Sequence, residues 1–411
     1  MNKRIGNIFK GDKVIWMVFL FLCLISIVEV FSASSTLTYK SNNYMGPISY
    51  HAVMIFLGVI VTVVTLNVPC RYFKLMTPFL LFISAVLLVW VLIFGEKTND
   101  AGRWISLFGF SFQPSELAKG TMVLVTAQIL SAMQRENGAD PRAFKWIMWF
   151  TGIAVLLIGK ENLSTAALLL VVIILMMIIG RVPWRQTGWL VGILGIACVF
   201  AVAVIMLLGD TEKEKQTTKD VMTEVQKPEE ESFWEKSLHR ADTWKGRIIS
   251  FFEPWPPPEK FDLDKNCQVG HANIAIASSE IIGKGPGNSL ERDYLPQAFS
   301  DFIYAIVIEE TGLFGAAFVA FLYIVLLFRT ARIASRCENN FPAFLIMGLS
   351  LLLVIQATFN MMVAVGLAPV TGQPLPLISK GGTSTIINCA YIGVMLSISR
   401  SAKMKKAVSE N

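Results

Sequence analysis

Charged residues are scarce in this chain: Asp, Glu, Lys and Arg make up 16% of its 411 positions, whereas apolar residues make up 54%. A water-soluble chain would carry roughly a quarter charged residues, so an ordinary soluble domain is excluded. The six cysteines stand singly, and no cluster of His, Asp or Glu indicates a disulfide framework or a dedicated metal site. The net charge of +6 contains no basic patch that would indicate nucleic-acid binding.

Long apolar runs fill the sequence instead. Runs of about 18 or more apolar residues are typical of membrane-spanning helices, because backbone groups in lipid must be hydrogen-bonded within their own segment. Ten such runs lie at about 14–34, 51–70, 76–95, 117–134, 146–159, 163–181, 187–208, 302–329, 342–367 and 383–400. The fifth is short, so nine helices is an alternative. The sequence therefore predicts an all-α polytopic membrane protein that forms a single membrane domain over 1–411.

Lys and Arg are distributed unevenly between the segments that join these runs. If the N-terminus is cytoplasmic and ten helices cross, the inside segments hold far more Lys and Arg than the short outside loops. This is the pattern of the positive-inside rule. It predicts a multi-pass protein of the cytoplasmic (inner) membrane with both termini in the cytoplasm.

The composition changes once, between about 209 and 300, which this topology makes a large extracytoplasmic loop between helices seven and eight. Its first part, 210–232, is rich in charge and poor in apolar residues, so we expect it to be disordered. Its second part, 233–266, holds three tryptophans and several phenylalanines and is expected to fold against the membrane domain. A loop of this length in a compact domain is usually functional.

Polar residues stand at the outer end of the fourth predicted helix, in the stretch AGRWISLFGFSFQPSELAK over 101–119. Pro114 is expected to open the helix, with Glu116 in its first turn and Lys119 at i+3 on the same face. Ionisable groups this close to lipid should pair and face the protein interior. A structural ion pair and a functional pair are equally good interpretations.

A second polar stretch, over 283–312, runs from a glycine-rich turn into the eighth predicted helix. Asp301 stands at the outer start of that helix, where it could either cap the helix or act as a general base. Glu309 and Glu310 lie two to three turns deeper. The turn GKGPGNS lacks the spacing of a nucleotide-binding loop, but its amides could face a diphosphate, with Lys284 as the counter-charge.

A third stretch, GLAPVTGQPLPLISKGGTSTIIN over 366–388, contains three prolines and four glycines. This content predicts a broken helix. Non-helical backbone at membrane depth is tolerated where it lines a cavity or packs within protein. We therefore expect a cavity wall here.

Together these stretches resemble the signature segments of the SEDS family, which includes the division protein FtsW and the elongation protein RodA. QPSELAK, GKGPGNS with the following LPQAFSDF, and GLAPVTGQPLPLISKGG occur in the family's order, and RADTWKGRIISFFEPWPPP precedes Gln268 as in the family's large loop. Four departures stand out. The family's QPDLGT is KENLST here, with Glu161 and Asn162 in place of Pro and Asp; Lys380 replaces an aromatic residue, His271 a glutamine and Phe299 a histidine.

The resemblance implies a peptidoglycan glycosyltransferase that polymerises lipid II, the undecaprenyl-diphosphate-linked disaccharide peptide, on the outer face of the membrane. It implies that Asp301 is the catalytic base of an inverting reaction with undecaprenyl diphosphate as the leaving group. The charge of that group could be neutralised by side chains or by a divalent cation, Mg²⁺ or Mn²⁺. The residues implied in substrate binding are Arg103, Glu116, Lys119, Gln268, Lys284, Ser379 and Lys380.

The resemblance also implies partners: a class B penicillin-binding transpeptidase and other membrane proteins of the divisome. The wording of the large loop favours septal wall synthesis, and an elongation-type polymerase is the alternative. A lipid II flippase is a further alternative, since the buried Glu29, Lys119, Glu309 and Glu310 would suit a transporter. A non-catalytic membrane scaffold is a third.

Overall fold

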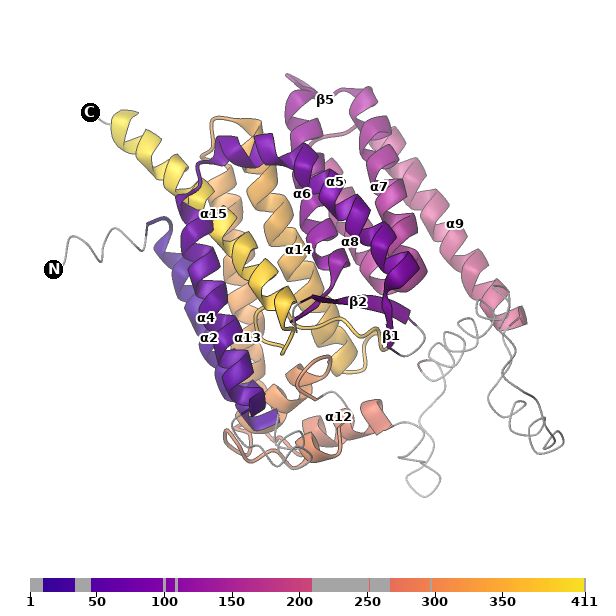
Figure 1. The fold of residues 1–411 in the computed structure, drawn as a ribbon, viewed down its shortest axis with the longest axis vertical. Coiled ribbons are helices and arrows are strands. Elements are labelled where there is room, and N and C mark those ends of the chain that lie inside the picture. Colours follow the sequence, from indigo (N-terminus) through magenta and orange to yellow (C-terminus); the bar gives the residue numbers. More distant parts are fainter. Residues whose placement is uncertain are drawn as a thin grey trace.

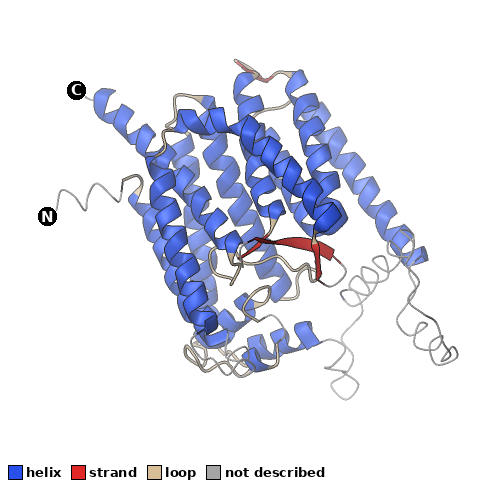
Figure 2. Cartoon of the chain, viewed as in Figure 1, coloured by secondary structure: helices blue, strands red, loops and turns tan. Residues whose placement is uncertain are grey.

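The computed structural model describes residues 10–33, 46–98, 101–107, 110–208, 251, 267–295 and 298–409. Most of them form long helices that lie side by side in one bundle (Figures 1 and 2). The long helices are α2 (Lys13–Ala33), α4 (Gly46–Asn67), α5 (Cys70–Phe94), α6 (Pro114–Ala132), α7 (Pro141–Glu161), α8 (Leu163–Ile179), α9 (Trp184–Leu208), α13 (Ile303–Ala334), α14 (Asn340–Ala364) and α15 (Thr383–Ser409). Each coincides with one predicted apolar run. The fifth run, which looked short, forms α7 with 21 residues.

Six of these helices, among the described residues, are long and apolar enough to cross a membrane: α2, α4, α5, α7, α13 and α14. Large apolar side chains such as Phe79 and Leu156 are exposed on the outside of the bundle. Lipid, and not water, is the solvent that suits such a surface. The fold is therefore that of an all-α polytopic membrane protein, as predicted, whereas the number of crossings and their orientation stay predictions.

Helix α14 lies at the centre of the bundle. Of the six apolar helices it is the most enclosed, with 61% of its apolar window inside the protein. It packs against α13, α6 and α8. Its side chains can therefore reach both the fourth predicted helix and the segments around the eighth.

One end of the bundle is closed by polar contacts between three helices far apart in the sequence. The Asp12 amide donates to Ser399 Oγ at 2.9 Å, and Arg329 Nη2 lies 2.7 Å from Asp12 Oδ2. The start of α2, the end of α13 and the later part of α15 therefore meet at this end. A short hairpin of β4 (Gln134–Arg135) and β5 (Gly138–Ala139) lies between α6 and α7.

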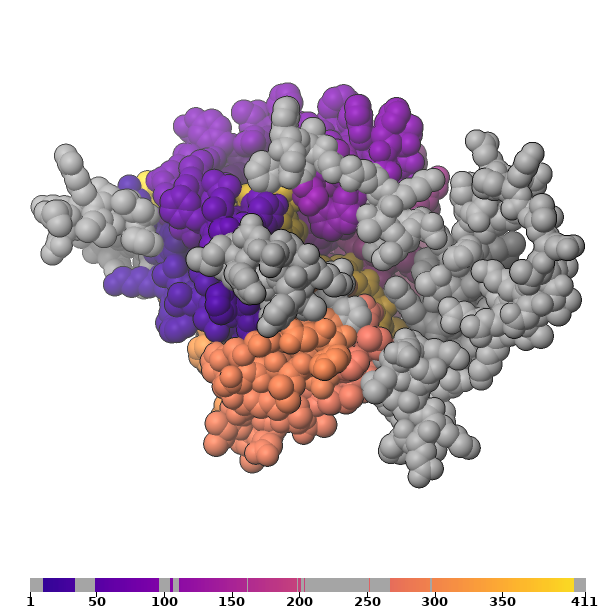
Figure 3. Space-filling view, turned by 60° about the horizontal axis from the view of Figure 1, so that its bottom comes forward, coloured from indigo at the N-terminus to yellow at the C-terminus, as the bar shows by residue number. Residues whose placement is uncertain are grey.

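The opposite end carries the non-helical segments (Figure 1). Here β1 (Glu96–Thr98), β2 (Ala101–Leu107) and β3 (Phe110–Phe112) form an antiparallel sheet in the order β1-β2-β3. The sheet was not predicted from the sequence. Helix α12 (Cys267–Ala277) and the short 3₁₀ helix η2 (Glu291–Asp293) cover another part of this end, and Figure 3 shows their surface in orange.

The large loop falls mostly outside the described residues. The predictions that 210–232 is disordered and that 233–266 folds against the membrane domain both concern residues outside them. The described part of the loop starts at α12, which packs against α13.

Candidate active site

Asp301 lies in a turn over 298–302 that leads into α13, and its side chain is half-buried. Its Oδ1 accepts a hydrogen bond from Ser300 Oγ at 3.0 Å. The N-cap residue of α13 is Phe302, whose side chain makes no cap hydrogen bond. Asp301 stands one residue before this N-cap position. Its role as a cap or as a general base stays a prediction.

The segment between α14 and α15, residues 365–382, forms no helix and passes beside Asp301. Ser379 fixes it there, because its hydroxyl donates to the Ser300 main-chain oxygen at 2.6 Å and accepts from the Leu375 amide at 2.7 Å. Gly372 faces the carboxylate: a Cβ at this position would lie 3.4 Å from Asp301 Oδ2. The broken segment predicted from prolines and glycines therefore forms a wall of the Asp301 environment.

Asn360 of α14 joins the two segments. Its side-chain amide donates to the main-chain oxygens of Asp301, at 2.8 Å, and Gln373, at 2.7 Å. One turn earlier, Gln356 donates to the main-chain oxygen of Pro374 at 3.0 Å. Two amides at i and i+4 on one helix face thus hold both the turn and the wall in place.

Glu116 and Lys119 form the predicted ion pair on α6. Their side-chain atoms lie 2.8 Å apart, and the side chains are 2% and 0% exposed. Lys119 Nζ also donates to Gln356 Oε1 at 2.7 Å. The pair is therefore connected through Gln356 to the wall beside Asp301. Buried charges need such pairing, because an isolated charge in this environment is very costly.

The departure KENLST has a local explanation in the structure. Asn162 is the N-cap of α8, and its Oδ1 accepts from the Thr165 amide at 3.2 Å. Asn and Asp serve equally well at this position. Thr165 Oγ1 in turn accepts from Gln373 Nε2 at 2.8 Å, so the segment supports the wall.

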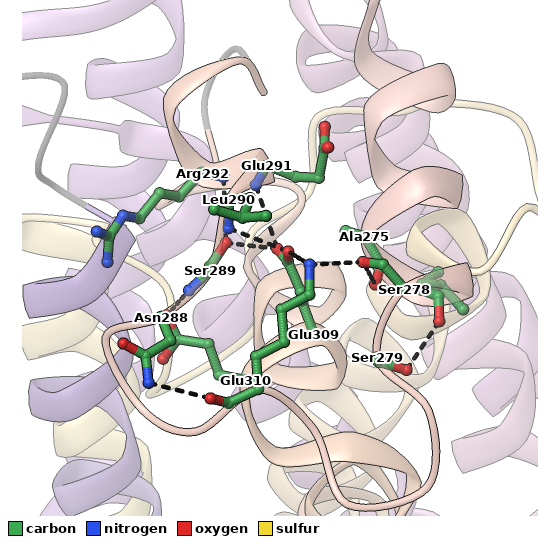
Figure 4. A network of polar contacts seen from close by, with 12 residues as sticks. Ala275, Ser278, Ser279, Asn288, Ser289, Leu290, Glu291, Arg292, Glu309 and Glu310 are labelled. Carbon is green, nitrogen blue, oxygen red and sulfur yellow. Dashed lines mark hydrogen bonds and ion pairs between the residues drawn. The ribbon is translucent and has the colours of Figure 1, made fainter.

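The glycine-rich turn is folded onto the two glutamates of α13. Figure 4 shows Ser289 and the main-chain nitrogens of Leu290 and Glu291 directed at the carboxylate of Glu309. Ser289 Oγ donates to Glu309 Oε2 at 2.5 Å, and the Leu290 amide to its Oε1 at 3.0 Å. Lys284 Nζ pairs with the same oxygen at 2.6 Å. In this structure Lys284 serves a buried carboxylate, and its role toward substrate stays a prediction.

Glu310 is held in a similar way. The Gly287 amide donates to its Oε2 at 2.9 Å, and Ser32 at the end of α2 donates to its Oε1. Arg292 donates to Ser32 Oγ at 3.0 Å and to the Gly287 main-chain oxygen at 2.6 Å. Both glutamates are fully buried. Several amides and side chains of the turn are therefore used within the fold.

Two glycines allow this turn to approach α13. Gly283 has φ +84° and Gly312, inside α13, has φ +68°, and a Cβ on either residue would collide with backbone of the other's segment. Left-handed backbone and this closeness both favour glycine. The non-helical Gly312 interrupts α13 at the point of contact.

Lys380 lies in the wall next to the turn of Asp301. Its Nζ stands 5.0 Å from the centroid of the Phe299 ring, and its amide donates to the Phe299 main-chain oxygen at 2.9 Å. Burial lowers the pKa of Lys380 below the usual value of a lysine. Two positions that depart from the family pattern are thus in contact with each other.

The remaining predicted site residues lie further along this end. Gln268 is in the first turn of α12, half-buried. His271 pairs with Glu291 at 2.6 Å and stacks on Tyr294. Arg103 lies in β2, and its side chain is outside the described part of the structure.

Among the described residues no three His, Cys, Asp or Glu side chains come together as a metal site. A divalent cation carried by a substrate diphosphate stays a prediction.

Three residues of the site were missed from the sequence: Gln356, Asn360 and Gln373. Gln356 and Asn360 stand inside the apolar run 342–367, and both are 1% exposed. Polar residues four positions apart in such a run are a signal of a shared buried face. That signal could have predicted their role, although not their partners.

This geometry defines a class of protein: an all-α membrane bundle in which buried side-chain amides hold a turn that carries a carboxylate. The chain belongs to the cell cycle protein family of FtsW, RodA and SpoVE, whose model matches residues 12–404. It is 28% identical over 403 residues to the peptidoglycan glycosyltransferase MrdB of Escherichia coli strain K12, covering 96% of this chain and 94% of MrdB.

Two further likenesses extend this result. A probable peptidoglycan glycosyltransferase FtsW of Hydrogenovibrio crunogenus is 28% identical over 407 residues, covering 96% of this chain and 93% of that protein. A solved chain from a peptidoglycan synthase complex that coordinates polymerization and crosslinking matches with a TM-score of 0.70 at 22% identity, covering 96% of this chain and 99% of that chain. The last likeness shows the fold.

Proposed function

We propose that this chain is a peptidoglycan glycosyltransferase that polymerises lipid II at the outer face of the cytoplasmic membrane. The observation that carries the proposal is the placement of Asp301. Its carboxylate stands outside the helix cap on a turn fixed by Asn360 and Ser379, with a glycine and no side chain at Gly372. Family membership and the relatives' names supply the reaction class.

In this proposal Asp301 is the general base. Its carboxylate takes the proton from the acceptor sugar's hydroxyl while that oxygen bonds to the anomeric carbon of the donor. The bond from this carbon to the donor's diphosphate oxygen breaks, and undecaprenyl diphosphate leaves with the electron pair. The configuration at the carbon is inverted. A diphosphate is a good leaving group, so the site needs to stabilise its charge more than to protonate it.

The test is a polymerisation assay with purified protein and lipid II in detergent. We expect Asp301→Asn to abolish glycan synthesis with nearly unchanged thermal stability, because Asn keeps the size of Asp but cannot accept the proton. Asp293→Asn, which removes an exposed carboxylate at the same end of the bundle, is the matched control. Near-normal synthesis by Asp301→Asn would overturn the assignment.

The same assay separates polymerisation from flipping, because polymerisation needs no sealed membrane. Lys119 and Glu309 are ion-paired and Glu310 accepts hydrogen bonds within the fold, which supports an enzyme. The buried Glu29 has one oxygen without a hydrogen-bond partner among the described residues and would still suit a transporter. Transport of lipid II in sealed vesicles without synthesis in detergent would favour the flippase.

We propose septal wall synthesis as the cellular role, on the basis of the sequence of the large loop. A class B penicillin-binding transpeptidase and divisome membrane proteins are the proposed partners. The relatives include both FtsW and MrdB, so an elongation role is the alternative. Depletion in the native cell distinguishes the two. Filaments with unfinished septa support the division role, and rounded cells that still divide support elongation.

A further inference from the structure

Phe299 and Lys380 carry the inference, because two departures from the family pattern meet in one contact. The family pattern has a histidine at the first position and an aromatic residue at the second. Here the aromatic residue and the cation have exchanged sides, and the ammonium lies 5.0 Å from the ring centroid. Both residues stand within the Asp301 environment, since Phe299 precedes Asp301 by two positions.

The Lys380 ammonium is short of negative charge. Its side chain is partly buried, and among the described residues it makes no ion pair. A cation over a phenyl ring gains only about 0.5 to 2 kcal/mol, less than the cost of removing a charge from water. An anion beside the ammonium would compensate for this cost.

His51 adds a second unused group. It lies in α4, is 3% exposed, and its Nε2 is 2.9 Å from Ser26 Oγ. The only hydrogen of the Ser26 hydroxyl goes to the Ile378 main-chain oxygen at 2.7 Å. His51 Nε2 therefore donates to Ser26, and Nδ1 is left as an acceptor that has no hydrogen-bond partner in the described part of the chain.

The segments that carry the two groups meet. Ser26 joins His51 to the main-chain oxygen of Ile378, two positions before Lys380. A Cβ at Gly382, two positions after Lys380, would lie 3.7 Å from the hydroxyl of Tyr50, the neighbour of His51. A cation and a buried acceptor on adjoining segments match a ligand that presents a phosphate next to a hydroxyl or amide hydrogen, and a sugar diphosphate has this arrangement.

We propose that Lys380, positioned by the Phe299 ring, binds the diphosphate of the lipid-linked donor, and that His51 Nδ1 accepts a hydrogen bond from the sugar next to it. The proposal rests on the proposed function for the identity of the substrate. It assigns the neutralisation of the leaving group's charge to Lys380. Phe299 acts as a positioning residue, because it touches the ammonium and not the substrate.

The first experiment measures binding without turnover. Undecaprenyl diphosphate is titrated onto the purified full-length protein, with undecaprenyl phosphate in parallel. Lys380→Met should weaken undecaprenyl diphosphate binding roughly tenfold or more, whereas Lys380→Arg should stay within a few fold of wild type. The matched control is Lys160→Met, which removes an exposed lysine at the end of α7. Equal affinities for Lys380→Met and Lys160→Met would overturn the proposal.

Folding is checked by melting temperature. Lys380→Met should melt at the wild-type temperature or above it, because the variant no longer buries an ammonium. If Lys380→Met melts at a lower temperature and binds more weakly while Lys380→Arg binds normally, the result still supports a role for the charge of Lys380. Loss of binding in Lys380→Arg as well would contradict it.

Phe299 and His51 give separate readouts. Phe299→Leu should weaken diphosphate binding, whereas Phe299→Tyr should keep the wild-type affinity. Adding Phe299→Leu to Lys380→Met should cause no further loss of affinity. His51→Phe should raise the KM for lipid II but leave the affinity for undecaprenyl diphosphate, which has no sugar, unchanged. Additive losses at 299 and 380, or equal effects of His51→Phe on both ligands, would contradict these assignments.

Failure of this proposal is distinguishable from failure of the proposed function. If wild-type protein polymerises lipid II but Lys380→Met keeps its kcat/KM and its affinity, only the assignment of Lys380 is wrong. If wild-type protein binds undecaprenyl diphosphate through Lys380 but makes no glycan, the site stands and the polymerase function is wrong.

Discussion

Asn360 donates its side-chain amide to the main-chain oxygen of Asp301 at 2.8 Å, across 59 positions of sequence. The central helix of the bundle thereby positions the residue that we propose as the base. Because the bond goes to the main chain, Asn360 fixes the turn without using the Asp301 carboxylate. Precise placement of a base matters, since small displacements of a catalytic group reduce the rate strongly.

We expect Asn360→Leu to lower both stability and polymerisation. The change leaves the buried main-chain oxygens of Asp301 and Gln373 without their donor, at a cost of about 1 to 3 kcal/mol for each unsatisfied group. Melting temperature and glycan synthesis measure the two effects. The control is Thr358→Val, since Thr358 is exposed on the same helix and its hydroxyl donates to the Val354 main-chain oxygen of that helix. Unchanged synthesis by Asn360→Leu would show that the turn is fixed by other contacts.

The Glu116–Lys119 pair predicts a strongly non-additive set of variants. Removing either partner alone leaves a buried charge and should cost about 3 to 5 kcal/mol. The exchanged double variant keeps the attraction between the two charges, so it should be less damaged than either single alanine variant. Melting temperature and activity of Glu116→Ala, Lys119→Ala and the exchange decide this. Strictly additive effects would mean that the two residues act separately.

Gly372→Ala should reduce polymerisation more than it reduces stability. Gly372 has φ +67°, where a Cβ costs roughly 1 to 2 kcal/mol, and the new methyl group would stand 3.4 Å from Asp301 Oδ2. The methyl group would then take up space beside the carboxylate that the substrate needs. Gly195→Ala is the control, because a Cβ there meets nothing within 4 Å. Equal activities of the two variants would argue that Gly372 serves only the backbone.

The lowered pKa of Lys380 predicts a specific pH dependence. Lysine is charged below its pKa, so the ammonium is lost at a lower pH than for an exposed lysine with a pKa of about 10.4. We expect kcat/KM for lipid II to fall as the pH rises through the pKa of Lys380. Lys380→Arg should move this fall to higher pH, because Arg stays charged above pH 12.

The titratable side chains on the segments around Lys380 are Tyr50 and His51 of α4 and Asp301 of the turn. An alkaline limb that is the same in wild type and Lys380→Arg would assign it to a group other than Lys380.

The Asp12–Arg329 pair predicts how stability depends on acid. Burial alone would raise the pKa of Asp12, but hydrogen bonds from Arg329, Val14 and Ile15 and the charge of Arg329 together hold it below its usual 3.8. The stabilisation is thus present at neutral pH and is lost as the pH falls through the folded-state pKa. Asp12→Asn should lower the melting temperature at pH 7, and the difference from wild type should shrink below about pH 4.

The control for Asp12→Asn is Arg135→Gln. Arg135 also pairs with an aspartate, but its side chain is 73% exposed, and exposed pairs contribute at most about 1 kcal/mol. A melting difference for Asp12→Asn that stays constant down to pH 3 would contradict the assigned pKa direction.

The sequence predicted the helices well because each lipid-spanning segment is a local property of composition. It predicted the Glu116–Lys119 pair for the same reason, since i and i+3 face each other on any helix. The sheet over 96–112 escaped prediction, because its strands are short and lie beside a helix start. The contacts of Asn360 with Asp301 and of Lys380 with Phe299 depend on packing between distant segments, which no local pattern encodes.

The contact of Gly283 with Gly312 has a mechanical consequence. The described end of the large loop meets α13 backbone to backbone, with no side chain between them that could bend or change rotamer. A displacement of the loop at Gly283 would therefore move α13 at its interruption, nine residues beyond its first residue, Ile303. The contact works as a stiff coupling between the loop and the helix that begins at the Asp301 turn.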